Sequence, residues 1–218
     1  MYLLLGALRR SWISSSSIRN GQWRGHAGLG HDPEGKVLGI LGMGNIGSVV
    51  AKRASAFEMH IQYHNRSPLP AERIPPGTKY VTFEELLRTS DIISVHLPLS
   101  DNTRYTIGSN EFAQMKDGAI LINTSRGPLV DEQALLDDLE SGKLYSAGLD
   151  VFENEPQVHP KLLENENVVL TPHMAAATFE TIVSNNKFSY FLRLTESSTN
   201  QKPLLCLMFE THFSMGLC

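Results

Sequence analysis

A glycine-rich loop between an apolar run and an amphipathic run constrains the fold of this chain more than any other feature. The loop reads GMGNIG over residues 42–47; it follows the apolar run Val37–Leu41 and opens a helical pattern over Asn45–Phe57. In such a unit the first glycine permits a tight turn, the second lets the backbone approach a pyrophosphate, and the third lets the helix pack on the strand. Free N–H groups at the helix start attract phosphate. We therefore expect dinucleotide binding rather than a plain turn. The candidate coenzyme-binding residues of the loop are Gly42, Gly44, Asn45, Ile46 and Gly47.

Short apolar runs alternate with amphipathic runs through the middle of the chain. The predicted strands are Val37–Leu41, Ile61–His64, Ile92–His96, Ala119–Asn123, Ala147–Val151 and Val168–Leu170. Helices are predicted between several of them: Thr82 opens a capping box, and Asp131 can cap a helix that ends before Gly142. Strands that alternate with helices favour an α/β fold, a doubly wound parallel sheet of Rossmann type.

The end of the second predicted strand bears on the choice of coenzyme. An NAD site normally carries Asp or Glu about 20 residues beyond the glycines, where the carboxylate holds the ribose 2′-hydroxyl. Here the strand ends in Asn65, Arg66 and Ser67, and no acid occurs between Glu58 and Glu72. Arg66 and Ser67 can instead hold a 2′-phosphate; the alternative is that Arg66 is an ordinary surface charge. We expect NADP to be preferred to NAD.

Composition excludes several classes of function. The chain has 218 residues, a net charge of −4 and only two Cys. A mildly acidic chain is a poor match for nucleic acid, and no Cys-x-x-Cys or His-Glu-x-x-His motif indicates a metal site. No apolar run approaches the about 18 residues of a membrane span. We expect a cytoplasmic protein with neither a metal nor a nucleic-acid or membrane partner.

The first 31 residues differ from the middle of the chain. They contain no acidic side chain, several arginines and the serine run Ser14–Ser17. Transit peptides share this composition. The alternative, which we favour, is a helix over Tyr2–Arg10 followed by a loop.

Three polar residues follow predicted strands, where ligands gather in an open α/β sheet. They are Arg126, Glu155 and His173. Reduction of a 2-oxo acid needs a cation for the carboxylate and carbonyl, a proton donor for the nascent alkoxide, and a carboxylate that orients the donor. Arg126, His173 and Glu155 can fill these roles in that order. Taken singly, each also fits an ordinary surface or backbone-bonded side chain.

Longer stretches resemble one family. Residues 124–156, TSRGPLVDEQALLDDLESGKLYSAGLDVFENEP, closely resemble the signature of D-isomer-specific 2-hydroxyacid dehydrogenases. Further resemblance lies in VVLTPHMAAAT (168–178), HLPLSDNTRYTIG (96–108) and RNGQWRG (19–25). Within the family, the Asn65-Arg66-Ser67 ending resembles NADPH-preferring glyoxylate/hydroxypyruvate reductases. The resemblance implies hydride transfer between NAD(P)H and a small 2-oxo or 2-hydroxy acid.

The same motifs imply roles for single residues. Arg126 matches the substrate-binding arginine, His173 the catalytic histidine, and Glu155 the acid that pairs with it. Asp150 matches the residue that contacts the nicotinamide carboxamide, whereas Glu153 comes too early in its motif and is expected to be peripheral. The other coenzyme contacts implied are Asn65, Arg66, Ser67, Leu97, Pro98, Thr103 and Thr124.

The resemblance also divides the chain. We expect an interdomain helix and linker (1–31), a dinucleotide-binding domain (32–178) and an atypical, poorly ordered tail (179–218). In the family the coenzyme domain is inserted into a second, substrate-binding lobe, and we expect most of that lobe to be missing here. Complete members are expected to be homodimers. The rival function is a non-catalytic dinucleotide-binding module or an inactive fragment of such an enzyme.

Overall fold

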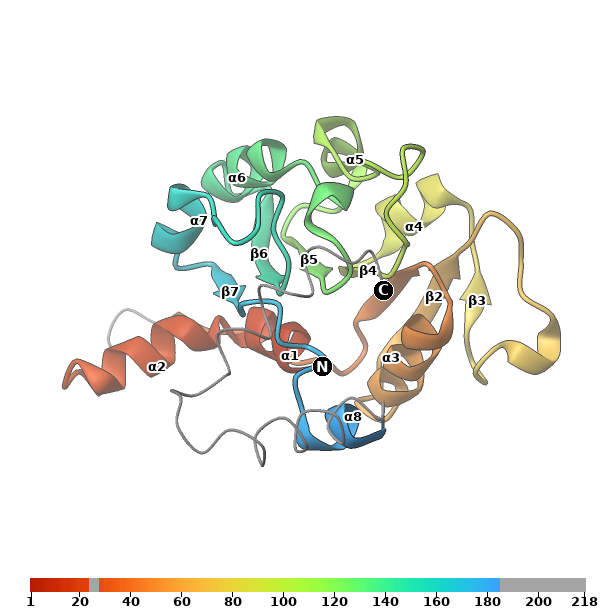
Figure 1. The fold of residues 1–218 in the computed structure, drawn as a ribbon, viewed down its shortest axis with the longest axis horizontal. Helices are drawn as coiled ribbons and strands as arrows, with labels where there is room; N and C mark the ends of the chain where they lie inside the picture. Colours follow the sequence, from red (N-terminus) through yellow and green to blue (C-terminus); the bar gives the residue numbers. More distant parts are fainter. Residues whose placement is uncertain (24–27, 185–218) are drawn as a thin grey trace, which may run out of the picture. The chain divides into compact units, whose positions relative to one another are not determined.

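A seven-stranded parallel sheet forms the centre of the chain (Figure 1). The computed structural model describes residues 1–23 and 28–184, so most of the predicted tail lies outside the described residues. The strands are β1 (Val37–Leu41), β2 (His60–His64), β3 (Lys79–Tyr80), β4 (Ile92–Val95), β5 (Ala119–Asn123), β6 (Leu144–Leu149) and β7 (Val168–Leu170). Their order is β3-β2-β1-β4-β5-β6-β7 and every pair is parallel, which confirms the predicted doubly wound fold.

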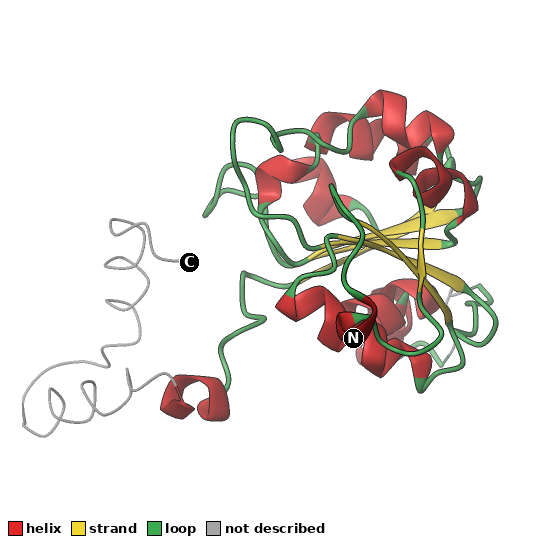
Figure 2. Cartoon of the chain, turned by 90° about the vertical axis from the view of Figure 1, so that its right-hand side faces the viewer, coloured by secondary structure: helices red, strands yellow, loops and turns green. Residues whose placement is uncertain are grey.

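Helices cover both faces of the sheet, as the turned view in Figure 2 shows. One core combines the strands with α1 (Tyr2–Arg9) and α3 (Asn45–Ser55). The other core combines them with α4 (Phe83–Thr89), α5 (Ser109–Gln114) and α6 (Glu132–Glu140). The remaining helical segments are α2 (Ser11–Arg19), η1 (Ala71–Arg73), η2 (Gly127–Leu129), α7 (Pro160–Glu164) and α8 (Phe179–Ser184). Among the residues that the structure describes, no helix is both long and apolar enough to cross a bilayer.

The helix predicted over Tyr2–Arg10 is present as α1, and it is part of the core. Its Leu4, Ala7 and Leu8 are almost fully buried, and the hydroxyl of Ser146 in β6 donates to the carbonyl of Ala7 at 2.9 Å. Burial on this scale explains why the segment folds as a helix.

The loop predicted after α1 is wrong, because α2 follows directly. Arg10 joins the two helices in the left-handed conformation, with a φ of 43°. In α2 only Ile13 and Ser17 are buried. So narrow an apolar stripe gives little helical pattern in the sequence, and the turn at Arg10 leads straight into the second helix.

The predicted helix caps are confirmed. The hydroxyl of Thr82 accepts the amide N–H of Glu85, and the carboxylate of Asp131 accepts those of Gln133 and Ala134. Gly142 follows α6 with a φ of 79°.

One predicted strand is misplaced and one was missed. β6 starts at Leu144 rather than at Ala147 and ends before Asp150, because Leu144 already pairs with Ala119 of β5. The two-residue β3 is too short for a recognisable pattern.

A compact unit runs from Met1 to Met174, and α8 belongs to a second unit, Ala175–Cys218. The predicted domain boundaries stay predictions.

Candidate coenzyme and catalytic site

The strand order reverses at β1, which pairs with β2 on one side and β4 on the other. Ligands of open α/β sheets bind beyond the carboxyl ends of the strands at such a reversal. Gly42 stands there with a φ of 101°, and a Cβ on it would lie 2.9 Å from the backbone carbonyl of His96, which follows β4. Both the conformation and the close approach require glycine at this position.

The other two glycines have the geometry that a pyrophosphate needs. Gly44 caps the start of α3. A Cβ on Gly44 would meet no atom within 4 Å, so a ligand can approach the backbone on that side. A Cβ on Gly47 would lie 2.5 Å from the carbonyl oxygen of Gly42, so α3 packs closely on the turn. The N–H groups of the first helical turn, which begins at Asn45 and Ile46, lack intrahelical acceptors. The loop therefore fits the diphosphate of a dinucleotide.

The end of β2 is tied to the glycine loop. Asn65 Oδ1 accepts the amide proton of Met43 at 2.7 Å, and the Tyr80 hydroxyl donates to the Asn65 carbonyl at 3.2 Å. The next two residues, Arg66 and Ser67, are exposed. The residues predicted to select the coenzyme thus lie beside the glycine loop.

One hydroxyl group orders the loop after β4 and another joins that loop to the one after β5, where the remaining coenzyme contacts were predicted. Thr103 Oγ1 donates to the carbonyl of Pro98 at 2.7 Å, and Ser125 Oγ donates to that of Leu97 at 2.5 Å. Thr124, half-buried, directly precedes Ser125.

His96, at the end of β4, is held neutral. Its Nε2 lies 2.9 Å from the hydroxyl of Ser94. Burial lowers the pKa of His96 to about 4. At neutral pH the imidazole therefore brings no charge to the glycine loop.

The structure brings two of the three predicted catalytic residues together. His173 Nδ1 lies 2.8 Å from Glu155 Oε2, and the amide of Phe152 donates to Glu155 Oε1 at 2.9 Å. The His173 side chain is 46% exposed and that of Glu155 only 17%. One oxygen of the Glu155 carboxylate is thus fixed by the backbone, and the other contacts an imidazole that is accessible to solvent.

The backbone around His173 is also fixed. His173 has a φ of 55°, and its N–H donates to the carbonyl of Asp150 at 2.8 Å. The buried Asp150 carboxylate accepts from the Thr171 hydroxyl and, at 2.8 Å, from the amide of Met174. Asp150, predicted to contact the nicotinamide, thus also organises the loop that carries His173.

Arg126 lies in the loop after β5, which is held by hydrogen bonds of its own and not by the Glu155–His173 pair. The side chain of Asn123 donates to the Arg126 carbonyl at 2.9 Å and accepts the amide proton of Ser125 at 3.0 Å. The Arg126 guanidinium donates to the Ser125 carbonyl at 2.7 Å. Within residues 1–23 and 28–184 it makes no ion pair with Glu155 or His173. The sequence analysis missed Asn123, for which the only signal was a polar residue at the end of an apolar run.

No cluster of His, Cys, Asp and Glu that could hold a metal ion occurs in the part of the chain that the structure describes. The polar groups of the site are those of a dinucleotide fold with a histidine–carboxylate pair at the carboxyl edge of its sheet.

Comparison with known proteins identifies the family. A family model described as D-isomer specific 2-hydroxyacid dehydrogenase, NAD binding domain, matches residues 1–175. The chain belongs to this family. The 2-hydroxyacid dehydrogenase domain present here is the one that binds the nicotinamide coenzyme.

Several relatives of this dehydrogenase domain are similar over most of the chain. The 4-methyl-2-oxopentanoate reductase A of Aspergillus oryzae is 54% identical over 181 residues, which cover 83% of this chain and 55% of the relative. Glyoxylate reductase 1 of Saccharomyces cerevisiae is 46% identical over 188 residues, 83% of this chain and 53% of the relative. The crystal structure of a glyoxylate reductase from Paecilomyes thermophila matches with a TM-score of 0.81 and 53% identity, over 86% of this chain and 59% of that one. The chain thus spans little more than half the length of these relatives.

Proposed function

We propose that this chain is the coenzyme-binding part of an oxidoreductase that transfers a hydride between NAD(P)H and a small 2-oxo or 2-hydroxy acid. The observation that carries the proposal is the pair of His173 and Glu155, 2.8 Å apart, on the sheet edge that also carries the glycine loop. A non-catalytic module requires only the loop, and a turnover assay separates the two functions.

The chain's own residues supply binding and proton transfer. When bound, the reduced coenzyme provides the hydride that forms the new C–H bond at the carbonyl carbon. His173 donates the proton from Nε2 to the carbonyl oxygen as its π bond breaks, and Glu155 holds Nδ1 and stabilises the charged ring. Arg126 binds the substrate carboxylate through its planar fork. In the reverse direction, His173 accepts the proton of the alcohol.

The substrate and the preferred coenzyme are part of the proposal. Relatives named glyoxylate reductase and hydroxypyruvate reductase support one of these two acids. The Met43 N–H is a donor, so the Asn65 side chain must turn its oxygen, the acceptor, toward the loop. The other atom of the amide, the donor Nδ2, is then left for a ligand. A donor beside Arg66 and Ser67 suits a 2′-phosphate, which supports NADP over NAD. The homodimer and the cytoplasmic location stay predictions.

Oxidation of NADPH in the presence of glyoxylate or hydroxypyruvate, measured on this domain joined to the substrate-binding lobe of a relative, tests the proposal. We expect His173→Gln to lower kcat by about 100-fold or more, because it removes the proton donor. Arg126→Lys should raise KM as well, because it loses the bidentate hold on the carboxylate. His60→Gln, an exposed histidine in β2, is the matched control and should leave both constants unchanged. Coenzyme binding without turnover of any 2-oxo acid, by the domain completed with a substrate-binding lobe, would favour the non-catalytic module.

A further inference from the structure

Two glutamates join the loop that carries Glu155 to the start of α6 by exchanging backbone hydrogen bonds. Glu153 Oε1 accepts the amide proton of Glu132 at 3.0 Å, and Glu132 Oε1 accepts that of Glu153 at 2.6 Å. Glu132 is the first residue of α6 and only 8% exposed. Its N–H lies in the first turn, where no intrahelical acceptor exists. Glu153 supplies that acceptor from the other loop.

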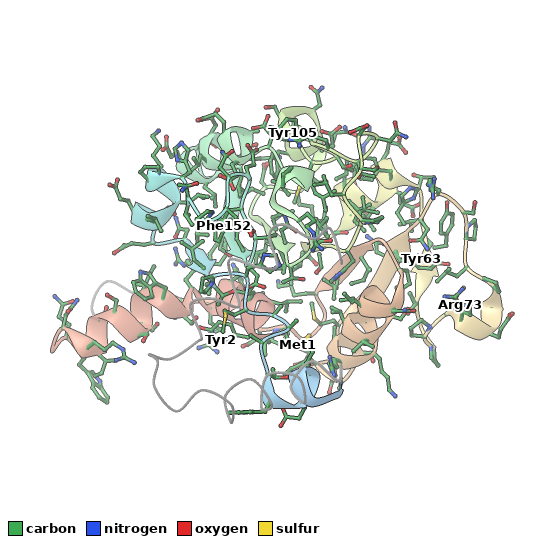
Figure 3. All side chains as sticks on the ribbon, viewed as in Figure 1. Met1, Tyr2, Tyr63, Arg73, Tyr105 and Phe152 are labelled. Carbon is green, nitrogen blue, oxygen red and sulfur yellow. The ribbon has the colours of Figure 1, made fainter. Side chains whose placement is uncertain are left out.

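A second contact joins the same two segments closer to Arg126. The residue after Arg126 is Gly127, and a Cβ there would collide with the backbone of Phe152. Tyr105, labelled with Phe152 in Figure 3, adds a bridge: its hydroxyl donates to Glu153 Oε2 at 3.4 Å and its amide to the Pro128 carbonyl at 2.8 Å. Residues 127–132 are therefore fastened to residues 152–153 at both ends.

From this junction, hydrogen bonds lead directly to the catalytic pair. The amide of Phe152 donates to one oxygen of Glu155, and the other oxygen contacts His173 Nδ1. A shift of the Phe152–Glu153 backbone therefore moves the carboxylate that orients the imidazole. A displacement of about 1 Å at a reacting group costs on the order of 100-fold in rate.

We propose that Glu132 and Glu153 are positioning residues, whose reciprocal hydrogen bonds fix the place of the Glu155–His173 pair relative to Arg126. The inference rests on the proposed function for the roles of those three residues. Neither glutamate touches substrate or coenzyme in this scheme.

The Glu132 carboxylate lies in surroundings that disfavour its negative charge. Burial raises the pKa of Glu132, as do the neighbouring carboxylates of Glu153 and Glu155, while the N–H bond from Glu153 and the charge of His159 oppose the rise. The two carboxylates thus lie close together at an electrostatic cost, which the reciprocal hydrogen bonds to the two backbone amides offset.

The test separates loss of the acceptor from loss of charge and from loss of stability. Glu153→Gln keeps an oxygen acceptor for the Glu132 amide, whereas Glu153→Ala removes it. Asp131→Ala is the matched control, because it removes the N-cap of α6 at the neighbouring residue but leaves residues 152–153 intact. Where the Glu153→Ala chain does not fold, Glu153→Asp shortens the side chain by one methylene and withdraws the acceptor.

The first readout needs no turnover. Long-range ¹H–¹⁵N NMR of the histidine rings, assigned with His173→Gln, reports which ring nitrogen of His173 carries the proton. We expect the Nδ1–H form in the unmodified chain, in Glu153→Gln and in Asp131→Ala, and its loss in Glu153→Ala or Glu153→Asp. Retention of the Nδ1–H form in the last two variants would overturn the inference. Absence of that form in the unmodified chain would instead count against the catalytic pair, and hence against the proposed function.

The second readout is kinetic. In the active protein, Glu153→Ala should lower kcat by about 10- to 100-fold while the Kd of NADPH stays within about twofold. Asp131→Ala should keep its kcat even if it lowers the unfolding temperature as much as Glu153→Ala does. An equal loss of kcat in both variants would show that Glu153 contributes only to stability.

Discussion

Asn65 Oδ1 accepts the amide proton of Met43 at 2.7 Å, so the residue that directly follows β2 holds the glycine loop in place. An aspartate can make the same hydrogen bond, but it exchanges the neutral amide nitrogen for a second, negatively charged oxygen. We expect Asn65→Asp to raise the Kd of NADPH by about tenfold, or about 1.4 kcal/mol, because its charge repels the 2′-phosphate. The Kd of NADH should not rise. Fluorescence titration with both coenzymes measures the ratio, and an unchanged ratio would contradict the proposed role of this position.

Arg66 is the cation that the proposed 2′-phosphate contact requires. Its side chain is exposed, and the residue before it, Asn65, is hydrogen-bonded to the glycine loop. We expect Arg66→Ala to raise the Kd of NADPH by about tenfold and to leave that of NADH unchanged. Arg73→Ala is the control, since Arg73, labelled in Figure 3, is likewise exposed and lies in η1. Equal affinities of the unmodified chain for the two coenzymes would defeat the argument for Arg66.

Gly44 and Gly47 should respond differently to the same substitution. At Gly44 a Cβ meets nothing within 4 Å, so Gly44→Ala should change the free energy of unfolding by only about 0.5 kcal/mol. The methyl group would occupy the space of the pyrophosphate, and coenzyme affinity should fall more than about tenfold. Gly47→Ala places a Cβ 2.5 Å from the Gly42 carbonyl and should cost about 1–3 kcal/mol of stability in addition. Denaturant unfolding and coenzyme titration of both variants provide the check; tight coenzyme binding by Gly44→Ala would mean that the diphosphate lies elsewhere.

Stability should fall in acid partly through His96. The unfolded chain protonates this histidine near its ordinary pKa of 6.5, whereas the folded chain keeps it neutral down to about 4. Between these values the unfolded state binds one more proton, so the free energy of unfolding decreases as the pH falls. We expect His96 to account for about 2 kcal/mol of the loss from about pH 7 to about pH 5. His96→Gln should remove that part of the pH dependence in urea titrations; an identical dependence in both proteins would place a charged imidazole in the fold.

The fold was predictable because its signals are local. Each central strand is an apolar run, and Thr82 and Asp131 mark helix starts by chemistry that acts within one turn. The two-residue strand β3 gives no such signal, since it is defined by its pairing with β2. The same holds for α2, in which only Ile13 and Ser17 are buried.

The residues of the site could be predicted from the sequence, but the hydrogen bonds that join them could not. The motifs indicated Glu155 and His173, and the structure brings them together. The exchange between Glu132 and Glu153 joins residues 21 positions apart, and nothing in either local sequence shows that a side chain of one loop satisfies the backbone of another. Glu153 was therefore expected to be peripheral, although it lies next to the backbone that holds Glu155.

The place of α1 in the core has a consequence for how the chain is made. Leu3 of α1 packs so closely on Gly148 of β6 that a Cβ there would lie 2.9 Å from it. A ribosome releases α1 long before it releases β6 and β7, so until these strands emerge they cannot cover the apolar face of α1. Contacts between segments so distant in sequence form late. Nascent chains should therefore acquire protease resistance around α1 only after β7 has left the exit tunnel.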